Sequence, residues 1–187
     1  DLEARFLALR DLPRGAQADV LVAEDRQTGR EVVIKLYRQD GNPYDISTMT
    51  KLDSADRRHV VQIIERGSSD GHAWELQEYC AHGTLWQAIT PGSRVSADQF
   101  TAIVRNLGDA LAHLHELKIV HRDVKPANVL VRSLNPLDLV VTDFGLSKEV
   151  TMSRDIGSVA GTFAYMAPEA HQGTIGRAGD WWGLGVL

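Results

Sequence analysis

The hydrophobic pattern changes its period once along the chain, near residue 80, and this change limits the fold more than any other feature. Before it, short β-branched runs flank polar turns, and residues 20–23 and 31–37 around a glycine-containing turn at 25–30 are one such pair. Runs of this kind around a short turn are typical of antiparallel hairpins. Two more short strands are expected at 61–64 and 73–77. The first part of the chain is therefore predicted to be rich in β-structure.

After the change, apolar residues recur every three or four positions. A capping box opens this stretch, with Ser96 at the N-cap and Gln99 three residues later. The apolar positions that follow are Phe100, Ile103, Val104, Leu107, Leu111, Leu114 and Leu117. This spacing predicts a buried amphipathic helix of about five turns. A β-rich part followed by a helical part suggests two subdomains that meet near residues 77–83.

Composition excludes several classes of function. The 187 residues include 20 Lys and Arg against 25 Asp and Glu, a net charge of −5. The chain therefore lacks the basic surface that nucleic acid or an anionic membrane requires. The one cysteine, Cys80, excludes an intrachain disulfide and fits a reducing compartment. No stretch reaches the roughly 20 apolar residues of a membrane helix, so a cytoplasmic location is expected, with a membrane tether outside this stretch left open.

Four short motifs follow one another in order. Lys35 ends the strand run Val-Val-Ile-Lys, and His-Arg-Asp at 121–123 comes directly after the predicted helix. Asn128 stands five residues beyond this aspartate, and Asp-Phe-Gly at 143–145 begins fifteen residues after Asn128. Ala-Pro-Glu at 167–169 comes last.

This order resembles the eukaryotic-type serine/threonine protein kinase catalytic domain, within the protein kinase superfamily. The resemblance runs from about Leu12 to the last residue. It implies an α+β, two-lobed protein kinase-like fold with a small antiparallel β-rich N-lobe and a mainly helical C-lobe. The expected domains are residues 1–80, the N-lobe with its hinge, and residues 81–187, a partial C-lobe. The C-lobe is expected to be truncated in the helix after Ala-Pro-Glu.

The resemblance implies transfer of the γ-phosphoryl group of Mg-ATP to a serine or threonine hydroxyl of a protein substrate. Asp123 is expected to accept the hydroxyl proton, Lys125 to contact the transferred phosphate and Lys35 to hold the α- and β-phosphates. Asn128 and Asp143 offer hard oxygen ligands, which suit Mg²⁺. The position of Lys125 is typical of the serine/threonine branch, and autophosphorylation is left open.

By the same resemblance, the ATP site takes residues from both parts of the chain. The expected ATP-binding residues are Leu12, Gly15, Val20, Val33, Lys35, Glu78, Cys80 and Leu130. Gln77 takes the gatekeeper position. Glu78 and Cys80 are expected to offer a backbone carbonyl and N–H to adenine.

A further group of residues is expected to control the catalytic loop. Arg122 resembles the arginine that pairs with an activation-loop phosphate. Ser158, four residues before Thr162, is the best-placed phosphosite, with Thr151 and Ser153 as alternatives. By the same resemblance, His121 is expected to be a packing residue behind Phe144, and Asp180 resembles the buried aspartate that ties down the backbone of the catalytic loop.

Two features depart from the family pattern. The glycine-rich loop keeps only Gly15, with Pro13 and Ala18 in place of the outer glycines, so weaker ATP engagement is expected. Residues 32–64 contain no Glu to pair with Lys35. The family register places Thr48 there, with Asp45 one turn away, and the partner of Lys35 stays unassigned.

These departures keep a second class of protein open, a pseudokinase that binds nucleotide or a partner and transfers nothing. The intact set of Lys35, Asp123, Asn128 and Asp143 favours an enzyme. A small-molecule kinase of related fold is a third alternative. The Gly-Thr-x-x-Tyr-Met-Ala-Pro-Glu stretch at 161–169 favours a polypeptide substrate over it. The substrate's identity and the activating signal are not encoded in these motifs.

Overall fold

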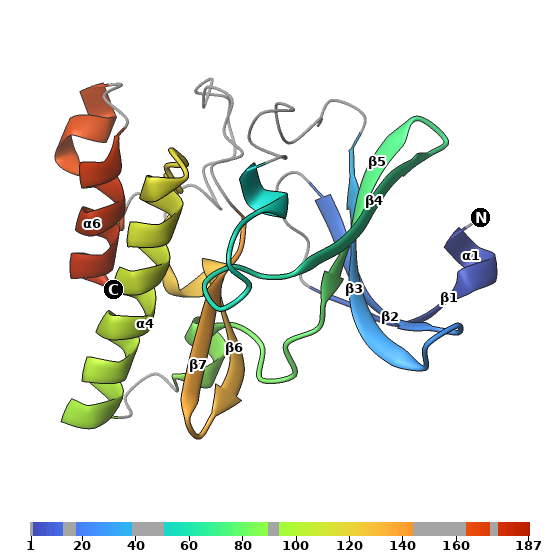
Figure 1. Cartoon of the computed structure of the whole chain (residues 1–187), viewed down its shortest axis with the longest axis horizontal. Helices are drawn as coiled ribbons and strands as arrows, with labels where there is room; N and C mark the ends of the chain where they lie inside the picture. The colour runs from blue at the N-terminus through green and yellow to red at the C-terminus, as the bar shows by residue number, and fades with distance from the viewer. Residues whose placement is uncertain (1, 13–17, 39–50, 90–93, 144–163, 173–175) are drawn as a thin grey trace. The chain divides into compact units, whose positions relative to one another are not determined.

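The computed structural model describes residues 2–12, 18–38, 51–89, 94–143, 164–172 and 176–187. The chain divides into two compact units, the first made of Asp1–Ile46 and Val61–Tyr79 and the second of Ser47–Val60 and Cys80–Leu187. In chain order (Figure 1) the elements are α1 (Leu2–Arg5), β1 (Phe6–Asp11), β2 (Ala18–Asp25), β3 (Arg30–Tyr37), β4 (Ile63–Ser69), β5 (His72–Glu78), α3 (Leu85–Ala88), α4 (Ala97–Glu116), η1 (Pro126–Asn128), β6 (Val129–Leu134), β7 (Leu137–Val141), η2 (Pro168–Gln172) and α6 (Arg177–Val186).

The first unit is a five-stranded antiparallel sheet in the order β1-β2-β3-β5-β4. The predicted hairpin is confirmed as β2 and β3, which pair without interruption from Ala18 opposite Tyr37 to Asp25 opposite Arg30. The Asp25 carboxylate accepts the backbone N–H of Gln27 at 2.9 Å. This bond closes the turn that brings the two strands together.

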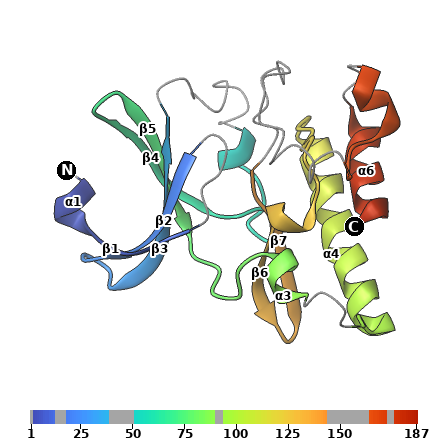
Figure 2. The same cartoon turned by 180° about the vertical axis from the view of Figure 1, so that it is seen from behind.

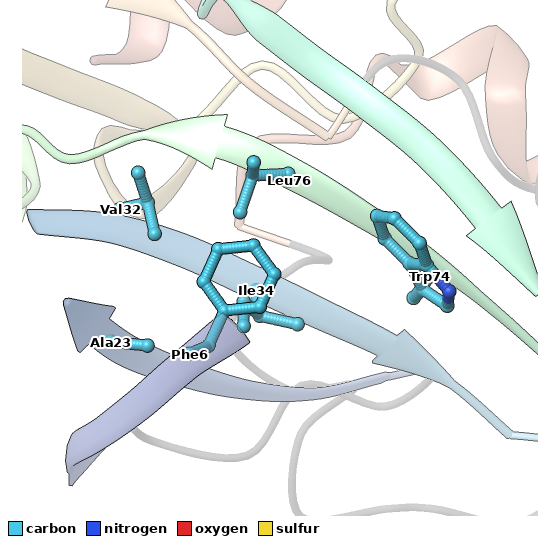
Figure 3. Close-up of a cluster of buried hydrophobic side chains, with 6 residues drawn as sticks. All are labelled: Phe6, Ala23, Val32, Ile34, Trp74 and Leu76. Carbon is cyan, nitrogen blue, oxygen red and sulfur yellow. The ribbon is translucent and has the colours of Figure 1, made fainter. Parts of the chain in front are cut away.

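One face of this sheet carries the apolar core of the first unit. Figure 3 shows the six side chains of this core, Phe6, Ala23, Val32, Ile34, Trp74 and Leu76. Because side chains alternate between the faces of a strand, Lys35 and Glu75 project from the opposite face. The sheet therefore separates an apolar face from a face with buried charge.

The second unit is built around α4. The predicted capping box is confirmed, because the Ser96 hydroxyl accepts the N–H of Gln99 at 3.1 Å and the Gln99 side chain accepts the N–H of Ser96 at 3.0 Å. The helix contacts β7 on one side and α6 on another, and Figure 1 shows α6 running beside it. In the view from behind, α3 lies against β6 (Figure 2).

The burial of α4 corrects one detail of the prediction. Ile103, Leu107, Leu111 and Leu114 are buried as expected, together with Ala110, but Phe100 is 62% exposed and Val104 is 40% exposed. Phe100 belongs to the first turn, before the first buried residue, and Val104 lies about 100° around the helix from Ile103. The predicted apolar positions therefore covered a wider and longer part of α4 than the residues that are buried.

Residues 44–52, before the second pair of strands, have Ile46, Met49 and Leu52 at weak helical spacing. Most of this segment lies outside the described residues, and residues 51–53 are helical. Among the helices that the structure describes, none is both long enough and apolar enough to cross a membrane.

Candidate active site

The predicted catalytic loop joins α4 to β6 in the second unit. It runs from His121 through Asp123 and Lys125 into the 3-10 turn η1, which ends at Asn128. Pro126 opens this turn, where its missing N–H costs no hydrogen bond. The loop therefore passes directly from a helix end to a strand, and its polar residues stand close together.

Asp180 on α6 anchors the backbone of this loop. It is 1% exposed, and its two oxygens accept the N–H of His121 at 2.9 Å and the N–H of Arg122 at 2.8 Å. This confirms the role predicted for Asp180. The His115 imidazole on α4 also bonds Asp180, with Nε2 2.7 Å from Oδ2. One buried carboxylate thus joins α4, α6 and the loop.

His121 links the loop to the segment after β7. Its side chain is 1% exposed, and Nε2 lies 2.9 Å from the carbonyl oxygen of Thr142. The imidazole is therefore buried, as the predicted packing role requires, and this bond satisfies one of its ring nitrogens. Phe144, the expected neighbour of His121, lies outside the described residues.

Asp123 is held by the two residues predicted to act with it. Asn128 Nδ2 donates to Oδ2 of Asp123 at 2.8 Å and to its backbone oxygen at 2.8 Å. Lys125 Nζ also lies 2.7 Å from Oδ2. Asp123 and Lys125 are only partly buried, with side chains 35% and 21% exposed. The carboxylate is therefore fixed in direction while it stays open to a partner molecule.

The two predicted metal ligands flank the open end of the β6–β7 hairpin. Val129 pairs with Val141, and the N–H of Thr142 donates to the carbonyl of Asn128 at 3.0 Å. Asp143 is the next residue, with a φ of 61°. Arg122 is exposed and also has a positive φ, of 70°. Non-glycine residues in this region carry backbone strain, which persists where surrounding bonds fix the chain.

Lys35 lies on β3 in the first unit and is 8% exposed. It stands opposite Val20 on β2 and opposite Glu75 on β5. Val33, two residues earlier, is half-buried and stands opposite Gln77. The strand register thus places Val20, Val33 and Lys35 on one face of the sheet.

Three further residues predicted to bind ATP have backbone hydrogen bonds within their own units. The N–H of Leu12 donates to the carbonyl of Val20 at 2.8 Å. The N–H of Glu78 donates to Gln62, and the carbonyl of Cys80 accepts from Gly83, both at 3.0 Å. These bonds involve the N–H of Glu78 and the carbonyl of Cys80. The predicted adenine contact needs the other two groups, the carbonyl of Glu78 and the N–H of Cys80.

Other predicted site residues are placed only in part. Leu130 is half-buried on β6 and bridges to Thr84. Gly15, Ser158 and Thr162 lie outside the described residues.

The buried polar residues that the sequence analysis missed include His115 and Glu75. No role was predicted for His115, and its bond to Asp180 was not foreseen. Glu75 is 2% exposed on β5. In each case the sequence held one clue, a polar residue at a position expected to be buried. His115 lies four residues after Leu111, and Glu75 lies between Trp74 and Leu76.

The described residues hold no cluster of three or more metal-binding side chains of the His, Cys, Asp and Glu types. The two predicted metal ligands are an amide, Asn128, and a carboxylate, Asp143. An amide and a carboxylate are oxygen donors of the kind that Mg²⁺ accepts.

Curated relatives are similar over nearly all of this chain. A serine/threonine-protein kinase of Drosophila persimilis, GL21140, is 34% identical over 181 residues, which is 92% of this chain and 24% of the relative. PrkC of Bacillus subtilis is 31% identical over 195 residues, or 100% of this chain and 30% of PrkC. For pkn2 of Myxococcus xanthus the identity is 31% over 199 residues. The chain spans about a quarter to a third of the length of these relatives.

The crystal structure of Rad53 1-466 in complex with AMP-PNP has a TM-score of 0.80 to this chain, at 25% identity. The match covers 98% of this chain and 47% of that one. It confirms the predicted α+β protein kinase-like fold. The family model described as protein kinase domain matches residues 6–187. With the aspartate, lysine and asparagine of the loop held on one another as described, and with this match, the chain belongs to the protein kinase domain family.

Proposed function

We propose that this chain is the catalytic part of an ATP-dependent serine/threonine protein kinase, acting on a protein substrate. The observation that carries the proposal is the Asp123 carboxylate, held by Lys125 at 2.7 Å and Asn128 at 2.8 Å. It sits in a loop whose backbone is anchored by Asp180. The relatives are named as serine/threonine-protein kinases of flies and bacteria, and these names support a serine or threonine hydroxyl as the acceptor.

In the proposed reaction, Asp123 orients the acceptor hydroxyl and takes its proton. The hydroxyl oxygen forms a bond to the γ-phosphorus while the bond from that phosphorus to the bridging oxygen of ADP breaks. Lys125 and Asn128 both bond Oδ2 of Asp123, so we assign the incoming proton to Oδ1. Lys125 would also lie near the charge of the transferred phosphoryl group.

Asn128 and Asp143 fit the role of holding Mg²⁺. The Asn128 amide nitrogen is directed at Asp123, which leaves the amide oxygen as the ligand atom. When bound, Mg²⁺ would neutralise phosphate charge. Lys35 would contact the α- and β-phosphates, and backbone groups of Glu78 and Cys80 would contact adenine. The AMP-PNP complex of Rad53 supports nucleotide binding by this fold.

Activation through phosphorylation is part of the proposal. Arg122 is exposed, next to Asp123, and its guanidinium is suited to a phosphate on Ser158. Autophosphorylation would supply this phosphate without a second enzyme. A cytoplasmic location for this part of the protein stays a prediction.

Two measurements test the proposal. Mg-ATP is expected to raise the unfolding temperature of the purified protein, because a ligand that binds only the folded state stabilises it. In a transfer assay, peptides with serine or threonine are expected to gain phosphate, while matched peptides with tyrosine gain none. Stabilisation by Mg-ATP without transfer to any acceptor would contradict the proposal and support a nucleotide-binding pseudokinase.

A further inference from the structure

Glu75 and Gln77 on β5 are two buried polar residues of the first unit, 2% and 3% exposed. Because side chains alternate along a strand, both lie on the face opposite the apolar core that contains Trp74 and Leu76 (Figure 3). The strand register sets Gln77 opposite Val33, one of the residues predicted to bind ATP. The Gln77 amide therefore belongs to the sheet face on which the nucleotide is expected.

The Glu75 carboxylate determines which way round the Gln77 amide lies. Nε2 of Gln77 donates to Oε2 of Glu75 at 3.0 Å, and the Tyr37 hydroxyl donates to the same oxygen at 2.9 Å. The other oxygen, Oε1, forms an ion pair with Nε of Arg66 at 2.9 Å. A carboxylate only accepts hydrogen bonds, so only the NH₂ end of the amide can face it. The amide oxygen of Gln77 is therefore directed away from Glu75.

An amide oxygen fixed in this way is a hydrogen-bond acceptor for a ligand on the same face. The 6-amino group of adenine carries two N–H donors, and the predicted contact with the Glu78 carbonyl uses one of them. Gln77 directly precedes Glu78 in the chain. We propose that the Gln77 amide oxygen accepts the second N–H and so selects adenine, with Glu75 as the positioning residue that directs this oxygen. The inference rests on the proposed kinase function, which supplies the nucleotide.

The test compares two nucleotides that differ only at position 6 of the purine. ATP carries the amino group there, and purine riboside triphosphate carries a hydrogen atom. The ratio of their dissociation constants, measured with Mg²⁺ by calorimetry, isolates the amino group because effects common to both nucleotides cancel. Gln77→Met keeps the length of the side chain and removes the acceptor. Its preference for ATP is expected to fall by about threefold to tenfold, the contribution of one hydrogen bond. An unchanged ratio would overturn the proposal.

Glu75→Gln tests the positioning role. An amide at position 75 can donate as well as accept, so the Gln77 amide is free to lie either way round. The preference for ATP is therefore expected to fall towards that of Gln77→Met. Where this variant does not fold, the double variant Glu75→Gln/Arg66→Gln replaces it, because it leaves no buried charge without its partner.

Tyr37→Phe is the matched control. It also removes a buried hydrogen bond to Oε2 of Glu75, but it leaves the carboxylate that orients Gln77. Its preference for ATP is expected to match that of the wild type. Equal losses of preference in Tyr37→Phe and Glu75→Gln would mean that the sheet has loosened, and the positioning role of Glu75 would be wrong.

Nucleotide binding and phosphate transfer are measured separately in the wild type. If both nucleotides bind and no phosphate is transferred, the proposed kinase function fails, while the ratio still decides on Gln77. If phosphate is transferred and Gln77→Met keeps the wild-type ratio, the kinase function stands and this inference is wrong. If neither nucleotide binds, both are wrong.

Discussion

Oδ1 of Asp180 accepts the backbone N–H of Arg122 at 2.8 Å and so fastens α6 to the loop that carries Asp123. The second oxygen accepts the N–H of His121 and lies 2.7 Å from Nε2 of His115. A carboxylate can accept all three bonds at once, and an amide of the same size offers only one acceptor oxygen. The negative charge at this site is therefore tied to the backbone geometry of the loop.

Asp180→Asn is expected to destabilise the protein by about 2–3 kcal/mol, because it leaves a buried N–H without an acceptor. Transfer activity is expected to fall by about 100-fold as the Asp123 backbone shifts. Asp109→Asn, an exposed change on α4, serves as the control. Denaturant unfolding and initial transfer rates check both effects. A stable Asp180→Asn protein with normal rates would show that the loop holds its shape without this carboxylate.

Gly183 on α6 packs against Val124 in the catalytic loop. A Cβ at position 183 would lie 2.9 Å from both the Cβ and the carbonyl oxygen of Val124. Gly183→Ala is therefore expected to cost about 1–3 kcal/mol of stability through overpacking. Gly185→Ala, two residues along the same helix, meets nothing within 4 Å and is expected to be neutral or stabilising. Equal thermal midpoints for the two variants would contradict close packing of α6 on the loop.

His59 and His113 lie close together in the second unit. The ring centroids are 5.3 Å apart, and Nε2 of His113 accepts the N–H of Asp56 at 2.9 Å. Burial, together with the neighbouring His113 and Arg58, lowers the pKa of His59, and Asp56 and Asp109 partly oppose this. The Arg58 guanidinium holds the pKa of the Asp56 carboxyl far below its usual range, so Asp56 stays charged near neutral pH.

A histidine whose pKa is lowered by folding takes up fewer protons in the folded state than in the unfolded state. The free energy of unfolding is then highest above the unfolded pKa of about 6.5 and falls as the pH drops through that value. His59→Gln is expected to flatten the dependence of the thermal midpoint on pH between neutral and mildly acidic buffer. The exposed His82→Gln is the control. A slope that is the same in His59→Gln and wild type would rule out His59 as its source.

The sequence pattern predicted those parts of the molecule that depend on neighbours along the chain. The β2–β3 hairpin follows from two β-branched runs around a short turn, and the start of α4 follows from Ser96 and Gln99. Asp180 was found through family resemblance, since nothing local marks its bonds to a loop nearly sixty residues away. Periodicity could not show that Phe100 is exposed, because exposure depends on which elements pack on each helical turn.

Strand pairing across the sheet was the second feature that the sequence could not predict. The register that sets Glu75 opposite Lys35 on one side and Arg66 on the other is fixed by three strands whose order, β3-β5-β4, differs from their order in the chain. The pairing of position 35 with position 75 could not be predicted from the residues that neighbour Lys35 along the chain.

Asp123 and Lys35 are the residues on which the proposed phosphoryl transfer depends most. The most direct measurement is transfer of labelled γ-phosphate from Mg-ATP to the protein itself and to a serine-containing substrate, in wild type, Asp123→Asn and Lys35→Met. Asp109→Asn and Lys51→Met are the charge-matched controls. Both site variants are expected to lose activity by about 100-fold or more while the controls keep it. Equal background signal in all five proteins, with Mg-ATP still raising the unfolding temperature, would contradict catalysis and leave a domain that only binds nucleotide.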